Sequence, residues 1–217
     1  MKVLVQLART TLAFVALLGI STAVYADLDS DILSIQQQWA RANYATPEDA
    51  QEQVFEDLVS DARQLVEQWP GQAEPLVWLA ISLSTDAGVN GGLSALGKVK
   101  EARKQLEAAE KINAEALDGS VYTSLGSLYY QVPGWPIGFG DEDKAELFLK
   151  KALAINPEGI DPNYFYGDFQ FEEGNYDVAV EYLTQASKAP ARPQRSLADK
   201  GRQAEIAKKL EAVREKI

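Results

Sequence analysis

Two pairs of small residues constrain the fold of this chain more strongly than any other feature. Gly126 and Ala145 form the first pair, and Gly167 and Ala179 form the second. The members of each pair lie in two amphipathic segments joined by a turn, so two helix backbones are expected to come close together there. We therefore expect an all-α fold in which helical hairpins stack side by side as an α-solenoid.

Apolar residues recur with a helical period along most of the chain. Helices are predicted over 32–42, 46–69, 75–83, 98–113, 120–130, 141–155, 161–172, 177–188 and 197–217. Loops are predicted over 84–96, which contains three glycines, and over 132–141, which is rich in Pro, Gly and aromatic residues. Both loops fall inside hairpins, and long insertions of this kind often gather on one functional side of a solenoid.

Residues 1–26 have the features of an export signal. Lys2 and Arg9 are basic, the stretch from Thr11 to Tyr25 carries no charge, and the residues before Asp27 suit a cleavage site. The apolar run is shorter than the roughly 20 residues of a membrane-spanning helix. We predict cleavage near Ala26 and a soluble periplasmic protein without membrane insertion after cleavage, with an uncleaved anchor as the alternative.

Composition disfavours several classes of function. Removing residues 1–26 leaves 19 basic and 32 acidic residues, a net charge of −13, which disfavours nucleic acid and anionic membranes as partners. The chain has no Cys and no His, which removes the common nucleophilic pairs and the usual zinc ligands. We predict no enzyme activity, no cofactor and no metal site. Carboxylate chemistry among Asp161, Asp168 and Glu172 remains the one catalytic hypothesis.

Spacing within the hairpins is specific between residues 118 and 190. Ala145, Leu149, Ala152 and Pro157 follow the spacing of the second helix of a tetratricopeptide repeat, and Gly126 and Tyr129 match its first helix. The small residues of this unit are 19 positions apart, seven more than the motif has, because of the 132–141 insertion. The next unit has no such insertion, and its motif residues are Gly167, Ala179, Leu183 and Ala186.

These motifs predict four parts of the chain: an export signal at 1–26, a degenerate N-terminal helical pair at 27–74, three tetratricopeptide-like repeats at 75–190, and a C-terminal capping helix at 191–217. The last helix is expected to turn a few apolar residues inward and many charges outward, because the end of a solenoid needs a polar cap. Asp141 and its acidic neighbours are interpreted as the first turn of a helix rather than as a cation site.

From Tyr122 to Leu210 the chain resembles a family of exported bacterial tetratricopeptide proteins. More distantly, it is similar to the T component of tripartite ATP-independent periplasmic (TRAP) transporters. The resemblance lies in residues 128–130, 132–141, 151–157, 161–167, 189–193 and 198–199. It implies a periplasmic scaffold, with a homo-oligomer such as a trimer as one arrangement, that presents an apolar channel to a partner such as a solute-binding protein.

In repeats of this kind, five positions of the first helix line the concave face. They correspond here to Ser120, Thr123, Ser127, Tyr130 and Gln131 in one unit, and to Asp161, Tyr164, Asp168, Phe171 and Glu172 in the next. The resemblance thus implies an aromatic strip edged by carboxylates, suited to an apolar or cationic peptide or to a small apolar ligand. Trp135 and Phe139 either cover this strip as a lid or fold back as a structural plug.

Two functional hypotheses follow. The first is a non-catalytic scaffold that binds a protein or peptide on its concave face through Tyr130, Trp135, Phe139, Tyr164, Asp168 and Phe171. The alternative is a small-ligand-binding accessory of a TRAP-type transport system, which predicts a connected apolar cavity beneath the 132–141 loop.

Overall fold

The computed structural model describes the backbone of residues 20–217 and the side chains from Leu28 onward, except that of Leu93. Most of the predicted export signal, residues 1–19, lies outside the described residues. The helices are α2 (Ile20–Tyr44), α3 (Glu48–Gln68), α4 (Ala73–Asn90), α5 (Gly92–Ile112), α6 (Ala116–Gln131), α7 (Glu142–Ile155), α8 (Ile160–Glu172), α9 (Tyr176–Ser187), the 3₁₀ turn η1 (Pro193–Arg195) and α10 (Ser196–Arg214).

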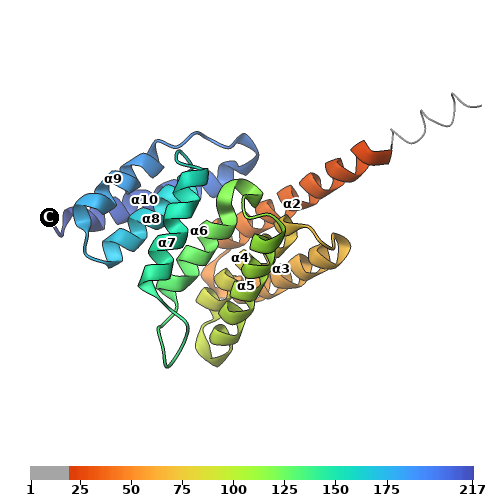
Figure 1. Ribbon diagram of the computed structural model, residues 1–217, viewed down its shortest axis with the longest axis horizontal. Coiled ribbons are helices and arrows are strands. Elements are labelled where there is room, and N and C mark those ends of the chain that lie inside the picture. Colours follow the sequence, from red (N-terminus) through yellow and green to blue (C-terminus); the bar gives the residue numbers. More distant parts are fainter. Residues whose placement is uncertain (1–19) are drawn as a thin grey trace, which may run out of the picture.

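The helices pack as consecutive hairpins, so the all-α prediction is confirmed (Figure 1). Within residues 20–217, pairing of extended backbone is limited to an isolated bridge between Gly134 and Gly140. In the same part of the chain, no helix has the length and apolar character needed to cross a membrane.

Small residues allow the closest helix contacts in two hairpins. A Cβ at Gly126 would lie 2.6 Å from Leu149 Cγ, so α6 and α7 could not pack as they do with a larger residue there. A Cβ at Gly167 would lie 2.8 Å from Leu183 Cγ, which gives the same relation between α8 and α9. Ala145 in α7 and Ala179 in α9 are both fully buried. The first pair therefore meets as expected, since a Cβ at Gly126 would also lie 3.2 Å from the carbonyl oxygen of Ala145, whereas Gly167 meets the backbone N of Leu183, one turn after Ala179.

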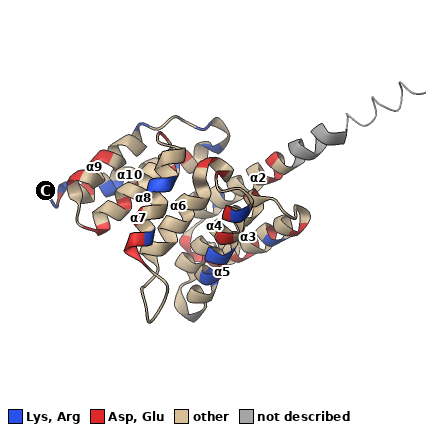
Figure 2. Ribbon diagram, viewed as in Figure 1, with Lys and Arg blue, Asp and Glu red and all other residues tan. Residues whose placement is uncertain are grey.

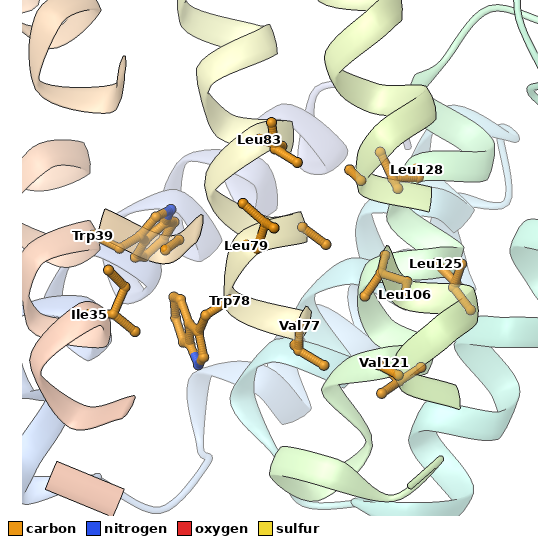
Figure 3. Packing of buried hydrophobic residues seen from close by; sticks show 14 of the residues in the cluster. Ile35, Trp39, Val77, Trp78, Leu79, Leu83, Leu106, Val121, Leu125 and Leu128 are labelled. Atoms are coloured by element: carbon orange, nitrogen blue, oxygen red, sulfur yellow. The ribbon is translucent and has the colours of Figure 1, made fainter. Parts of the chain in front are cut away.

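The core runs through the stack as a continuous apolar layer (Figure 3). On its N-terminal side, the rings of Trp39 in α2 and Trp78 in α4 meet edge to face with centroids 6.3 Å apart. Further along, Leu106 of α5 and Leu125 of α6 are both fully buried in the same cluster. Burial of this kind stabilises by roughly 25 cal/mol for each Å² of apolar surface removed from water.

The predicted loop over 84–96 is wrong. Helices α4 and α5 continue through this stretch and are separated only by Gly91, whose φ of 56° suits a residue without a side chain. Asp86 lies buried near the end of α4, and its carboxylate forms an ion pair with Lys98 of α5, whose Nζ is 2.7 Å away. The extra residues of this unit therefore lengthen the hairpin, because glycines at exposed positions of a helix weaken it without ending it.

Helix α10 does more than cover the end of the stack. It packs on α8 and α9 and also reaches α2, so the last described helix contacts the first. Gly201 lies against the ring of Tyr44, and Gln37 Nε2 donates to the carbonyl of Gln194 at 3.4 Å. Ala198, Ile206 and Val213 are buried, whereas the neighbouring Ala207 is exposed.

Candidate ligand groove

A groove of about 700 Å³ lies on the inner side of the curved stack. Its walls come from α2, α4, α5, α6 and α8, from the segment around η1, and from α10. The volume lies within the range of roughly 300–1,000 Å³ that is usual for ligand sites in proteins. Helix α10 reaches α2, and residues of both helices line one end of this space.

One wall of the groove is apolar and partly aromatic. It is formed by Trp39, Trp78, Ile81, Leu96, Val99 and Phe165. Trp39 is fixed by a 3.0 Å hydrogen bond from its Nε1 to Thr85 Oγ1, and both residues line the groove. A rigid aromatic wall offers apolar contact area at a small cost in side-chain entropy.

A second part of the groove lining carries a row of hydroxyl and amide groups along α6. The row consists of Ser120, Thr123, Ser124, Ser127 and Gln131. Four of these occupy concave positions implied by the resemblance, and Ser124 adds to them. The hydroxyls of Ser120 and Thr123 donate to carbonyl groups one turn earlier, at 2.6 and 3.3 Å, which leaves their lone pairs free to accept hydrogen bonds.

At the end lined by α10 and α2, Asp161 of α8 holds two arginines. Arg192 Nη1 lies 2.8 Å from one carboxylate oxygen and Arg202 Nε lies 3.1 Å from the other. Arg192 also pairs with Asp199 at 2.6 Å, and Arg202 also pairs with Glu205. Each of these two guanidinium groups is thus matched by carboxylates, and the network ties α8 to α10 and to the segment that precedes it.

The network changes the acidity of its members. Burial alone would raise the pKa of Asp161, but the charges of Arg202 and Arg192 outweigh it and hold that pKa below its ordinary value. Burial is also the main cause that raises the pKa of the neighbouring Tyr164 to about 12. Asp161 therefore stays ionised in the folded state across the physiological range.

Arg195 differs from the other two arginines at this end. Its guanidinium carbon lies 5.5 Å from the centre of the Trp78 ring, and the residue lines the groove. Its Nε is buried without a hydrogen-bond partner within the described part of the chain. Burial is the main cause that lowers the pKa of Arg195, and the charges of Asp161 and Asp199 act in the opposite direction.

The aromatic strip implied by the resemblance is not an open surface. Tyr130 donates a 2.7 Å hydrogen bond to Asp168. Arg202 lies 4.3 Å from the ring centre of Tyr164, and Lys209 lies 4.6 Å from that of Phe171. Helix α10 supplies both cations, so it occupies the concave side of the last repeat, where the partner was expected to bind.

The two aromatic residues of the 132–141 loop lie in different surroundings. Trp135 is 89% exposed and points away from the core, whereas Phe139 packs on Tyr129 with ring centroids 5.6 Å apart and lies under Arg103. The loop carries no charge before Asp141, which caps α7 (Figure 2). Ile137 lies at the groove beside the end of α6. Trp135 and Phe139 therefore do not act together as a lid or as a plug.

The other motif residues lie where the helices pack. Ala152 and Ala186 are fully buried in α7 and α9. Pro157 is exposed, and its carbonyl accepts a 2.8 Å hydrogen bond from Asn163 Nδ2 at the start of α8. Asp141 caps α7 by accepting from the Lys144 backbone N–H at 3.1 Å. Among residues 28–217, no three metal-ligating side chains gather at one point.

Sequence reasoning missed several residues that line the groove. Trp39 and Trp78 come from helices with weak or incomplete repeat spacing, and Arg195 and Arg202 follow the last repeat. One signal for the end lined by α10 was present, because the resemblance segments 189–193 and 198–199 include Arg192 and Asp199, which pair in the structure.

Comparison with solved structures agrees with this geometry. The crystal structure of a thermophilic TPR protein from Thermus thermophilus superimposes with a TM-score of 0.55 at 17% sequence identity, covering 88% of this chain and 95% of that one. The chain has a tetratricopeptide-repeat-like fold. The chain matches no protein-family model and no curated protein sequence. The tetratricopeptide-like hairpins α6–α7 and α8–α9 are the ones that carry the Gly126 and Gly167 contacts.

Proposed function

We propose that the protein is a non-catalytic tetratricopeptide-repeat-like scaffold that binds an extended segment of a partner polypeptide in its inner groove. The observation that carries this proposal is the pairing of two unlike walls around one space. The apolar wall of Trp39 and Trp78 suits apolar side chains, and the hydroxyl row of α6 suits the N–H and C=O groups of an extended backbone.

Binding should depend on the groove and not on the aromatic strip of Tyr130, Tyr164 and Phe171, which α10 covers.

An array of 10-residue peptides with random sequences gives a direct test, because it needs no knowledge of the partner. The variant Ser124→Trp places a large ring in the groove, and Ser60→Trp places the same ring on the exposed side of α3. We expect Ser124→Trp to abolish binding of the peptides that the unchanged protein selects, and Ser60→Trp to retain it. Equal binding by both variants contradicts the proposal.

A second candidate is a small-ligand-binding accessory of a transport system. The groove volume of about 700 Å³ favours it, as does the position of Ile137 from the 132–141 loop at the groove. Native mass spectrometry of the purified protein tests this candidate. A bound small molecule that is present in the Ser60→Trp variant and absent from Ser124→Trp supports it, and a protein free of small molecules in both variants contradicts it.

Export to the periplasm belongs to the same proposal, and residues 1–26 support it by their charge and apolar character. Intact-mass measurement of protein taken from the periplasm of expressing cells tests it. We expect a chain that begins near Asp27. A chain that keeps residues 1–26 and stays in the cytoplasm contradicts export.

A further inference from the structure

The tip of the 132–141 loop is an exposed apolar surface. Trp135 is 89% exposed and Ile137 is 67% exposed, and residues 132–140 carry no charge. From residue 28 onward, Trp135 is the most exposed of the large apolar side chains. Burial of a tryptophan ring is strongly favourable because the ring has a large apolar area. A partner that covers this ring would gain a stabilisation that the fold itself leaves unused.

The loop has a fixed shape. The amide of Gly140 donates to the carbonyl of Pro133 at 3.0 Å, and the amide of Gly138 donates to the carbonyl of Gly134 at 3.1 Å. On the inner side of the loop, Phe139 packs against the core. Because these contacts already order the loop, its tip can bind a partner with a small loss of conformational entropy.

The start of α7, next to the loop, is acidic (Figure 2). Glu142 and Asp143 are exposed in the first turn of α7, and Glu173 is exposed just after α8. Burial raises the pKa of Glu173, and the negative charges of Glu142 and Glu146 add to this rise. These carboxylates from α7 and from the end of α8 therefore lie close enough to repel one another.

The neighbouring cations are already paired. Their ion pairs, at 2.7–3.3 Å, join Lys144 to Asp141, Lys150 to Glu146 and Arg103 to Glu107. Within the described part of the chain, Glu142, Asp143 and Glu173 have no ion pair. The exposed apolar tip thus stands beside carboxylates whose charge the fold does not neutralise.

This charge indicates which kind of partner fits the loop. A second copy of the chain would bring the same acids and a net charge of −11, and an anionic membrane surface would also be repelled. A protein with an apolar surface bordered by lysine and arginine complements both parts of the region. Tryptophan is among the residues that contribute most to binding at protein interfaces.

We propose that the 132–141 loop docks a basic partner protein, which covers Trp135 and Ile137 with an apolar surface and faces Glu142, Asp143 and Glu173 with lysine or arginine side chains. Ile137 lies at the inner groove, but Trp135 and the three acids do not line it. This docking surface is therefore additional to the function proposed above and does not depend on it.

The probe is a fluorescent helical peptide of leucine and lysine, in which lysines border an apolar stripe. A matched peptide has glutamate in place of each lysine. In anisotropy titrations, we expect the protein to bind the Leu/Lys peptide and not the Leu/Glu peptide. Trp135→Ser should weaken binding about tenfold or more, because it removes the central apolar contact. The double variant Glu142→Gln/Glu173→Gln should weaken it roughly two- to tenfold.

Matched controls separate this surface from general stickiness and charge. Ile112→Ser removes another exposed apolar side chain, at the end of α5, and should bind the peptide as the unchanged protein does. Glu48→Gln/Glu52→Gln removes the same charge from the exposed side of α3 and should change the affinity less than about twofold, because salt screens distant charges. Circular dichroism of each variant reports whether it folds.

Several outcomes would overturn this inference. They are no binding of the Leu/Lys peptide, equal binding of the two peptides, unchanged binding by Trp135→Ser, and equal losses in the two acid variants. Loss of Leu/Lys binding in Ser124→Trp would place the peptide in the groove, which overturns the docking surface and leaves the proposed function standing.

Two other occupants have their own readouts. Sedimentation with phosphatidylcholine vesicles that requires Trp135, without binding of the Leu/Lys peptide, would assign the loop to a membrane surface. A dimer in analytical ultracentrifugation that Trp135→Ser abolishes would assign it to a second copy of the chain. Either result overturns the basic partner.

Discussion

Tyr130 and Asp168 bind each other. The Tyr130 hydroxyl donates to Asp168 Oδ2 at 2.7 Å and accepts from Gln131 Nε2 at 3.0 Å, while Lys209 Nζ lies 2.7 Å from the other Asp168 oxygen. Both residues were expected to contact a partner on the concave face. They instead join α6, α8 and α10, so part of the predicted binding surface is internal structure.

The variant Tyr130→Phe should therefore lower stability without affecting binding in the groove. It removes one donor to a buried carboxylate, and we expect the free energy of unfolding in urea to fall by about 1–3 kcal/mol. Tyr176→Phe is the matched control, because Tyr176 is only partly buried and its ring packs on Phe171, and its change should stay within about 0.5 kcal/mol. Loss of peptide binding by folded Tyr130→Phe would contradict the structural role assigned here.

Stability should fall in acid partly because of Asp161. Its pKa is lower in the folded chain than in the unfolded chain, so the unfolded state takes up the proton first as the pH falls. The stabilisation is complete above about pH 4, the ordinary range of an aspartate, and is lost as the pH falls through the folded pKa. Urea unfolding at intervals from pH 6 to pH 2 measures it.

Asp161→Asn should flatten this acid dependence and lower the free energy of unfolding at pH 6 by about 2–3 kcal/mol, because Arg192 and Arg202 lose their shared carboxylate. Asp61→Asn, on the exposed side of α3, should keep the full acid dependence. A parallel shift of the whole curve in Asp161→Asn, with its slope unchanged, would argue against the pKa displacement.

Replacing a glycine by alanine should change stability according to the space around that glycine. Gly126→Ala forces a Cβ to within 2.6 Å of Leu149, and we expect a loss of about 1–3 kcal/mol. Gly97→Ala in α5 meets nothing within 4 Å and should stabilise the helix by roughly 0.5–1 kcal/mol. Thermal unfolding of the two variants, one less stable and one more stable than the unchanged chain, checks both signs at once.

The two aromatic residues of the 132–141 loop should respond in opposite ways. Trp135→Ser removes an 89% exposed ring and should leave stability within about 0.5 kcal/mol. Phe139→Ala loses contact with Tyr129 and Arg103 and should cost roughly 2 kcal/mol or more. Acrylamide quenching of tryptophan fluorescence gives a second readout, since Trp135→Ser should remove the most accessible emitter.

The hairpins α6–α7 and α8–α9 could be predicted because their packing depends on residues in consecutive helices, which lie close together in the sequence. Gly126 with Leu149 and Gly167 with Leu183 leave a spacing that can be recognised without coordinates. The fold class followed from that spacing and from the helical period of the apolar residues.

The candidate site could be predicted only in part. The α6 positions Ser120, Thr123, Ser127 and Gln131 were placed on the concave face, and they line the groove. The path of α10 was not predicted, because the pairs that fix it, such as Arg202 with Asp161, join residues 41 positions apart and follow no period. The error at 84–96 came from counting three glycines as breaks, whereas the chain turns only at Gly91 and Gly92, the two that have a positive φ.

The contact of α10 with α2 also bears on mechanics. An open superhelix of repeats is easily deformed, because each repeat touches only its neighbours and small rotations add along the stack. In this protein, the contact between α10 and α2 joins the last described helix to the first. Widening the groove therefore requires breaking the contact between α10 and α2, so the width of the groove is tied to the stability of this contact.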